Sequence, residues 1–472
     1  MGGTVSEKEA ALTEVPAPNS KEYMGNLSRA LGRPLGSALL FALILALIAW
    51  RSGDALLLPS LDFEDGRDML AFYFNNPGAE NIFRLYAGYV SLLPNAIAWA
   101  SVNLLPLIAA PFAFAAASTM LAATSFFLIS RPAHSWLIAS PAVRALFSLA
   151  LAILPLSKEF LVTNVAYSQW TILLVLVVLV TRRPLPTSNG GLAAWVVAVA
   201  LCAASNPLSI MCLPLAVIHL FLAGSRRQKI CVLALSGFLI AYQIFCVDHG
   251  SVRPVIEFQS ITLALKTFLA RVVCEVFIGP RITNLLVLSG ESKFLYMGGS
   301  ALLLLLLSMT ASSAKPARNS LIVLSAVVFA LSLVTIAVMT RYTTPETSGI
   351  YLNLVVLQRY FYVPKVTILS MFMWQIMPRL EQAVAGPPRR ALKTSLVISA
   401  IGLFLVALAQ GNSFLYGGNA PEGLRVKQLV EDVQTNLAKA KLGQPYSSTH
   451  VLPRDWGGGV TLDIDQRRRN LK

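Results

Sequence analysis

Long apolar segments alternate with short polar segments along most of the chain. Most of the apolar segments approach the length of about 17 to 25 residues that a helix needs to cross a bilayer. The pattern therefore predicts an all-α polytopic membrane protein with about 11 transmembrane helices. The predicted helices cover about 35–52, 104–130, 141–156, 169–181, 191–205, 207–224, 230–246, 295–312, 320–340, 361–378 and 394–410.

Polar segments flank this transmembrane domain of residues 35–410. Residues 1–34 are rich in Pro, Ser, Glu and Lys and predict a disordered tail. No A-x-A-like cleavage site closely follows the first apolar segment, so we expect it to stay as a signal anchor. Residues 411–472 are again polar and predict a small segment outside the membrane.

Basic clusters set the orientation of these helices. Every second connection carries such a cluster, namely "SRP", "TRRP", "SRRQK", "KPAR" and "PPRR". Short loops rich in Lys and Arg stay in the cytoplasm. We therefore expect a cytoplasmic N-terminus, a first outer loop at 53–103, and a C-terminal segment on the outer side.

Two stretches on the predicted outer side mix apolar and polar residues. They read "RLYAGYVSLLPNAIAWA" and "FQSITLALKTFLARVVCEVF". Their composition and spacing predict amphipathic helices that lie on the membrane interface.

Composition agrees with a lipid environment. Hydrophobic residues make up 56% of the chain and charged residues only 13%, with a mean hydropathy of +0.65. The net charge of +15 could indicate nucleic-acid binding. We expect no nucleic-acid partner, because the basic residues lie mainly in the short clusters between apolar segments, as orientation signals do.

Carboxylates are concentrated in the first outer loop. The stretch "LDFEDGRDML" holds Asp62, Glu64, Asp65 and Asp68 within seven positions. One interpretation is a solvated loop with a turn at Gly66. The other is a general base at the boundary of water and membrane, where a carboxylate removes a proton from an acceptor hydroxyl while a lipid-linked donor enters from the bilayer.

Several motifs give the chain a family resemblance over most of its length. They are "EDG" (64–66), "YAGYVSLLP" (86–94), "KEFLVTNVAYSQW" (158–170), "SNPLSIMCLP" (205–214) and "QRYFYVP" (358–364). With an acidic first outer loop, an odd number of spans and a polar outer C-terminal segment, the chain resembles the GT-C class of membrane glycosyltransferases. It is most similar to a group of bacterial GT-C-like membrane proteins.

This resemblance implies a multi-pass protein of the bacterial inner membrane with its outer loops and residues 411–472 in the periplasm. The donor would be a sugar on polyprenyl phosphate, and the acceptor a periplasmic cell-envelope molecule: O-antigen or another glycan, a lipid or a protein. Membrane lipids would be its other partners. An inverting, single-displacement mechanism is the natural hypothesis, because one base and one phosphate-stabilising cation suffice for it.

The resemblance also assigns roles to residues. An acidic residue of the first outer loop acts as the base in this class, which corresponds here to Asp65, with Glu64 as its partner and alternative. A cation must stabilise the phosphate leaving group; Arg359 is the first candidate and Arg341 the second, although an interfacial Arg also snorkels to lipid headgroups. Candidates for sugar or acceptor contacts are Tyr86, Tyr89, Glu159, Asn164, Gln169, Trp170 and Tyr360.

Trp and Tyr at this depth are alternatively interfacial anchors. Asn206 and Pro207 in "SNP" predict a hairpin turn whose amide could also reach the pocket. No second acidic motif has the spacing of a metal site, so the ion of the oligosaccharyltransferases is unsupported, and we expect no metal ligands and no cofactor besides the lipid-linked donor.

Three alternative functions stay open. A lipid-linked oligosaccharide flippase or transporter would need ionisable residues within the helices, which are nearly free of them. An O-antigen polymerase or ligase would use cations in later outer loops, where Arg253, Arg271 and Arg281 lie. A scaffold role would leave the clustered carboxylates without a purpose.

Overall fold

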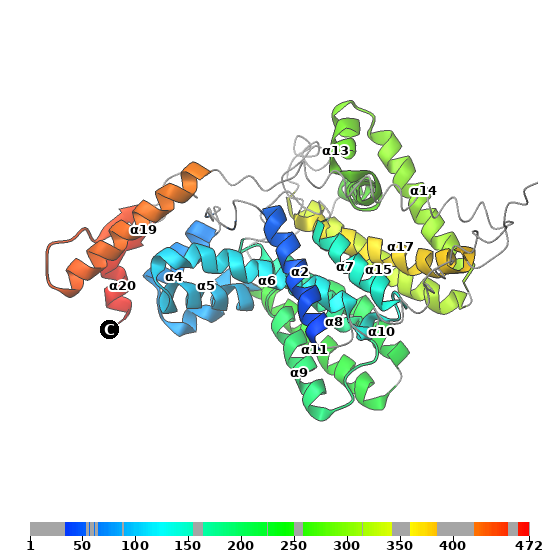
Figure 1. Ribbon diagram of the computed structural model, residues 1–472, viewed down its shortest axis with the longest axis horizontal. Helices are drawn as coiled ribbons and strands as arrows, with labels where there is room; N and C mark the ends of the chain where they lie inside the picture. Colours follow the sequence, from blue (N-terminus) through cyan, green and yellow to red (C-terminus); the bar gives the residue numbers. More distant parts are fainter. Residues whose placement is uncertain are drawn as a thin grey trace, which may run out of the picture.

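The structure of this chain is a computed structural model (Figure 1). It describes residues 34–52, 56, 61, 65–86, 89–153, 164–223, 225–249, 258–313, 315–341, 359–384, 420–451 and 461–471. Helices dominate this part of the chain, and the strands within it form two short two-stranded sheets.

Ten of the eleven predicted apolar segments lie in the described residues, and each contains a helix. The eleventh, 394–410, lies outside them. The observed helices are α2 Pro34–Ser52, α6 Ala110–Ser130, α7 Pro141–Ile153, α8 Ser168–Val180, α9 Asn189–Ala203, α10 Leu213–Ala223, α11 Arg226–His249, α14 Ser292–Ala311, α15 Pro316–Arg341 and α17 Arg359–Val384. A 3₁₀ turn, η3 Leu107–Ala109, precedes α6, and another, η5 Pro207–Cys212, precedes α10.

Within the described part of the chain, five segments are long and apolar enough to cross a membrane: α2, 107–130, 226–246, α14 and 316–339. The apolar helices α7, α8 and α9 and the segment 207–222 are shorter. The fold is thus all-α and consistent with a membrane protein, and the number of about 11 spans stays a prediction. The main core lies around α8, whose residues from Trp170 to Val178 are all buried.

The first outer loop folds into short elements. These are a π-helix, η1 Asp65–Ala71, then α4 Phe72–Asn75, η2 Ala79–Phe83, the strand pair β1 Leu85–Tyr86 and β2 Tyr89–Val90, and α5 Leu92–Leu104. The predicted interfacial helix is therefore wrong in its first half, where Tyr86 pairs with Tyr89 across an antiparallel hairpin. Only α5 is helical, and it packs against α4, η2 and α6.

The C-terminal segment docks on this first loop. It contains α19 Ala420–Lys441, the antiparallel pair β3 Thr449–Val451 and β4 Thr461–Asp463, and α20 Ile464–Asn470, which lie at the left in Figure 1. The Asn75 side chain donates to the Thr461 carbonyl at 2.6 Å and accepts from the Asp463 amide at 2.8 Å. Apolar side chains from both parts share one buried cluster. The two parts therefore pack together in the structure, and their position on the outer side of the membrane stays a prediction.

The second predicted interfacial helix is also corrected. It forms α12 Phe258–Thr267, a π-helix η6 Phe268–Cys274 and α13 Glu275–Leu288. All residues from Thr267 to Phe277 are buried, so this stretch has no face for lipid headgroups and lies inside the bundle. η6 packs closely against α14, which helps to bury it. The contact requires glycine at position 299, because a Cβ atom there would collide with the Leu269 carbonyl.

Two sets of contacts join segments that lie apart in the sequence. At the predicted outer end, the Tyr242 hydroxyl donates to the carbonyls of Val90 (2.8 Å) and Ala204 (3.1 Å). At the predicted inner end, Arg131 donates to the Ser37 hydroxyl at 2.6 Å. That the basic end faces the cytoplasm stays a prediction from the positive-inside rule.

His134, in the inner loop between α6 and α7, gives a pH prediction. Its Nε2 donates to the Val178 carbonyl at 2.9 Å, and burial lowers its pKa to about 4. Since the unfolded chain binds the proton near pH 6.5 and the folded chain does not, its contribution to stability is full above pH 6.5 and is lost as the pH falls toward 4. We expect this group to cost about 3 kcal/mol of unfolding free energy over that range.

Denaturant unfolding in detergent at pH 7.5 and pH 4.5 measures this dependence. His134→Gln removes the titration, so the variant should lose less stability on acidification than the wild type does. Equal losses in the two proteins would contradict the prediction.

Candidate functional site

The first acidic loop and the N-terminal end of α8 meet at Asp65. Its Oδ2 accepts the amide of Val165 at 3.1 Å, and its Oδ1 accepts the amide of Ala166 at 2.9 Å. The side chain is buried, with the residue only 3% exposed, so Asp65 does not belong to a solvated loop. Both amides belong to the turn at 165–167 that leads into α8, and the positive end of the helix dipole also favours a carboxylate there. Asp65 therefore fixes the first loop on the buried helix.

Asn164 closes the turn that leads into α8. Its Oδ1 accepts the Tyr167 amide at 2.9 Å, and the residue is buried. Asn favours turns because its side chain accepts nearby backbone amides. The side-chain oxygen expected to contact a sugar is thus engaged in holding this turn.

Gln169 links three segments at the same end. Its Oε1 accepts the Tyr89 hydroxyl at 2.9 Å, which joins the β1–β2 hairpin to α8. Its carbonyl accepts from the Asn206 amide at 2.8 Å. The Asn206 Oδ1 in turn accepts the Leu208 amide at 2.8 Å, so "SNP" forms the expected turn and also reaches this end of α8.

Aromatic rings cover the next layer of the site. Trp170 and Tyr360 make an edge-to-face contact with ring centroids 4.8 Å apart, and both are buried. The Arg359 guanidinium lies 4.4 Å from the centre of the Tyr167 ring and 5.4 Å from that of Tyr360. Trp170 is thus packed inside the fold instead of anchoring an interface, and Arg359 is held by cation–π contacts.

The structure therefore brings seven of the predicted site residues together at one end of α8. They are Asp65, Tyr89, Asn164, Gln169, Trp170, Arg359 and Tyr360. Glu64 and Glu159 lie outside the described residues. Tyr86 is placed in β1 beside Tyr89, and Arg341 ends α15, a helix that packs against α17.

Sequence analysis missed a buried ionic cluster in the same bundle. The Glu275 carboxylate accepts from Lys365 Nζ at 2.7 Å and from Arg271 Nη1 at 3.0 Å. Arg271 Nη1 also donates to the Asn284 Oδ1 at 2.7 Å. Lys365 lies in α17, one of the helices expected to be almost free of ionisable residues, so that expectation is wrong. The spacing of Arg271 and Glu275, four apart, was the available signal.

Lys365 also relates this cluster to the predicted site, because Arg359, Tyr360 and Lys365 all belong to the first two turns of α17. α17 packs against both α8 and η6. One helix therefore carries the phosphate-binding candidate and a buried cation of the ionic cluster.

Within the described ranges, no group of three or more His, Cys, Asp or Glu side chains could hold a metal ion. The arrangement offers a carboxylate anchor, an adjacent acidic loop, aromatic surfaces and one cation at a single helix end. No family model matches the chain, and no curated protein or solved structure is significantly similar to it.

Proposed function

We propose that the chain is a GT-C-like glycosyltransferase that moves a sugar from a polyprenyl-phosphate donor to a periplasmic cell-envelope acceptor. The observation that supports this best is the contact of Asp65 with the Val165 and Ala166 amides, which joins the acidic first loop to the segment "NVAYSQW". Arg359 and Tyr360 lie against the same segment through Tyr167 and Trp170.

In the proposed reaction, the acceptor hydroxyl oxygen attacks the anomeric carbon on the face opposite the phosphate. The bond between that carbon and the phosphate oxygen breaks, and the lipid phosphate leaves with the electron pair. The hydroxyl proton passes to a carboxylate. The sugar configuration is inverted, and no covalent enzyme intermediate forms.

The two neighbouring carboxylates take different roles in this proposal. Both oxygens of Asp65 accept backbone amides and its side chain is buried, which suits a positioning residue. We therefore assign the base to Glu64, the residue immediately before Asp65 in the chain, and the anchoring of that base to Asp65. This reverses the order of preference that the sequence suggested.

Arg359 is the proposed ligand of the donor phosphate. Its guanidinium is half-buried on the Tyr167 ring, so its side chain is oriented before the donor arrives. Arg presents a planar fork of donors that matches phosphate oxygens. Trp170 and Tyr360 are buried next to this guanidinium and would support the Arg359 side chain from within the fold.

Glu64→Gln tests the assignment of the base. We expect transfer from a polyprenyl-phosphate sugar by the purified protein to fall about 100-fold or more, because general-base catalysis contributes that much. Asp62→Asn removes a carboxylate from the same stretch and should keep activity within about threefold of the wild type. Full activity of Glu64→Gln would contradict the assignment.

Surface glycans of a deletion strain test the reaction class. Loss of one sugar, measured by mass spectrometry and restored by the wild-type gene, is the result expected for a transferase. An undelivered lipid-linked intermediate without a missing sugar would instead indicate flipping or polymerisation.

The buried cluster of Arg271, Glu275 and Lys365 favours a second candidate, a lipid-linked oligosaccharide flippase or an O-antigen polymerase. Intramembrane charges commonly mark substrate pathways. The deletion experiment separates this candidate from transfer through the accumulated intermediate.

A further inference from the structure

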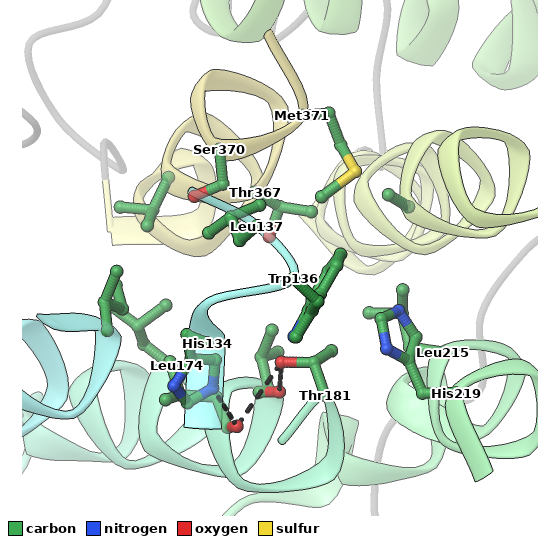
Figure 2. A pocket seen from close by; sticks show the side chains of 15 residues that line it. His134, Trp136, Leu137, Leu174, Thr181, Leu215, His219, Thr367, Ser370 and Met371 are labelled. Atoms are coloured by element: carbon green, nitrogen blue, oxygen red, sulfur yellow. Dashed lines mark hydrogen bonds between the residues drawn. The ribbon is translucent and has the colours of Figure 1, made fainter. Parts of the chain in front are cut away.

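A cavity lies at the end of the bundle opposite the Asp65 site. It contains about 40 Å³ of space, enough for a few waters or one small anion. Figure 2 shows Trp136, from the loop after α6, projecting between His134 and His219, with the C-terminal end of α8 below. The two sites lie at opposite ends of α8, about 20 Å apart at 1.5 Å per residue.

Two residues that line this cavity, Trp136 and His219, and their neighbour Arg183 carry unused hydrogen-bond donors. Within the described chain, Trp136 Nε1, His219 Nε2, and the Nε and Nη1 atoms of Arg183 are buried and make no hydrogen bond. Arg183 is 9% exposed and His219 is 1% exposed. Arg183 contacts both lining residues, since its guanidinium carbon lies 4.9 Å from the Trp136 ring centre and its Nη2 lies 2.9 Å from His219 Nδ1.

The Arg183 contact also fixes the tautomer of His219. Guanidinium only donates, so Nδ1 must accept and the neutral ring carries its proton on Nε2. Nε2 is therefore a donor at the cavity wall. The Thr181 backbone lies near the ring, and His219 Nε2 makes no hydrogen bond to it within 3.5 Å and good alignment.

The nearby helix end does not supply the missing acceptors. Its last carbonyls are already used: Val177 accepts from Thr181, Val178 from His134, and Leu179 from Trp195. Among the described residues, no carboxylate lies within ion-pair distance of Arg183, and the charged group that acts on it is the like charge of Arg318. Burying a guanidinium without an anion costs desolvation free energy, and an anion bound at this end of the molecule would offset that cost.

We propose that this cavity binds a phosphate group, with Arg183, His219 and Trp136 as its donors. Phosphate offers acceptors in several directions, and Arg binds it through two parallel N–H groups. Arg318 adds positive charge nearby, which favours a doubly charged anion over a carboxylate. The same chemistry is offered by free phosphate and by a lipid headgroup with a terminal phosphate. The inference does not depend on the proposed transferase activity.

Titration of the full-length protein in detergent with inorganic phosphate tests this site, with Trp fluorescence and the unfolding temperature as readouts. We expect saturable changes in the wild type and at least tenfold weaker binding by Arg183→Gln. Arg182→Gln removes a charge from the adjacent position and should stay within twofold of the wild type. Trp136→Phe should lose most of the fluorescence change.

Arg183→Lys keeps the charge but not the fork of donors, and it replaces Arg183→Gln as the test variant if Arg183→Gln does not fold. It should bind phosphate at least threefold more weakly than the wild type does. Nanodiscs of phosphatidylcholine with and without phosphatidic acid identify the source. If phosphatidic acid weakens the binding of inorganic phosphate, the natural ligand is a lipid headgroup. If phosphatidic acid has no effect on phosphate binding, the natural ligand is soluble phosphate. No saturable response in the wild type, or equal binding by wild type, Arg183→Gln and Arg183→Lys, would overturn the proposal.

Discussion

Glu275→Ala is expected to lower the free energy of unfolding by about 3–5 kcal/mol, the largest stability effect that a single substitution in the described part of the chain should have. Glu275 holds Lys365 at 2.7 Å and Arg271 at 3.0 Å, and all three residues are nearly inaccessible to solvent. Removing the carboxylate leaves the buried charges of Lys365 and Arg271 without the counter-charge that pairs with both, and the hydrogen bond of Arg271 to Asn284 does not replace that charge. Reversible unfolding in mixed detergent and SDS micelles measures the difference.

Two further variants separate charge from volume in this experiment. Replacing the three residues together by Leu and Met, as Glu275→Leu with Arg271→Met and Lys365→Met, should recover most of the lost stability, because apolar side chains of similar volume need no partner. Glu291→Ala removes the exposed pair with Lys293 at 3.2 Å and should cost about 1 kcal/mol or less. A Glu275→Ala variant as stable as the wild type would mean that water or a neighbouring group neutralises the cluster.

The sequence was sufficient to place the helices. Their length and apolar character are local properties, so the segments predicted at 141–156 and 169–181 correspond closely to α7 and α8. The grouping of the loops into inner and outer sets rests on the alternation of basic clusters along the chain and stays a prediction. The predicted helix boundaries were wrong where proline restricts the backbone. The helix predicted from residue 104 begins only at Ala110, because a 3₁₀ turn follows Pro106.

Burial of polar groups could not be predicted in the same way. The partners of Asp65 are 100 and 101 residues away along the chain, in the turn that precedes α8, where their amides point to Asp65 instead of pairing within a helix. Composition likewise suggested a solvated acidic loop and an interfacial helix at 258–277. Tertiary packing buries both Asp65 and the segment from Thr267 to Phe277 instead. Pairing across 90 residues, as between Glu275 and Lys365, has no local signal.

These contacts give α8 a central place in the molecule. Its N-terminal end receives a carboxylate, while its C-terminal end lies beside unused donors of Arg183 and His219. The two ends differ in charge preference. Backbone amides gather near the N-terminal end of α8, whereas the last carbonyls at its C-terminal end already accept hydrogen bonds. A change at either end should therefore affect its own site, and the variants at Asp65 and Arg183 can be interpreted separately.

Asp65→Asn is expected to reduce sugar transfer about 100-fold or more, through displacement of the first loop from α8. The substitution places an NH₂ group against one of the two backbone amides, so that two donors face each other where a charge-assisted hydrogen bond existed. Displacement of a catalytic group by about 1 Å costs that much activity. Asp68→Asn changes another carboxylate of the same π-helix, one paired with Arg67 at 2.7 Å, and should keep activity within about threefold of the wild type.

Amide hydrogen exchange distinguishes the two possible roles of Asp65. If Asp65 positions the loop, the amides of Val165 and Ala166 should exchange about 10 to 100-fold faster in Asp65→Asn than in the wild type. The substitution removes the charge from the hydrogen bonds that protect these amides, so the local opening that exposes them costs less free energy. Lost transfer with unchanged exchange would make Asp65 the base and overturn its assignment to Glu64. Faster exchange with full transfer would move the reaction away from this end of α8, because the contact that unites the acidic loop with the aromatic segment would then be dispensable for the chemistry.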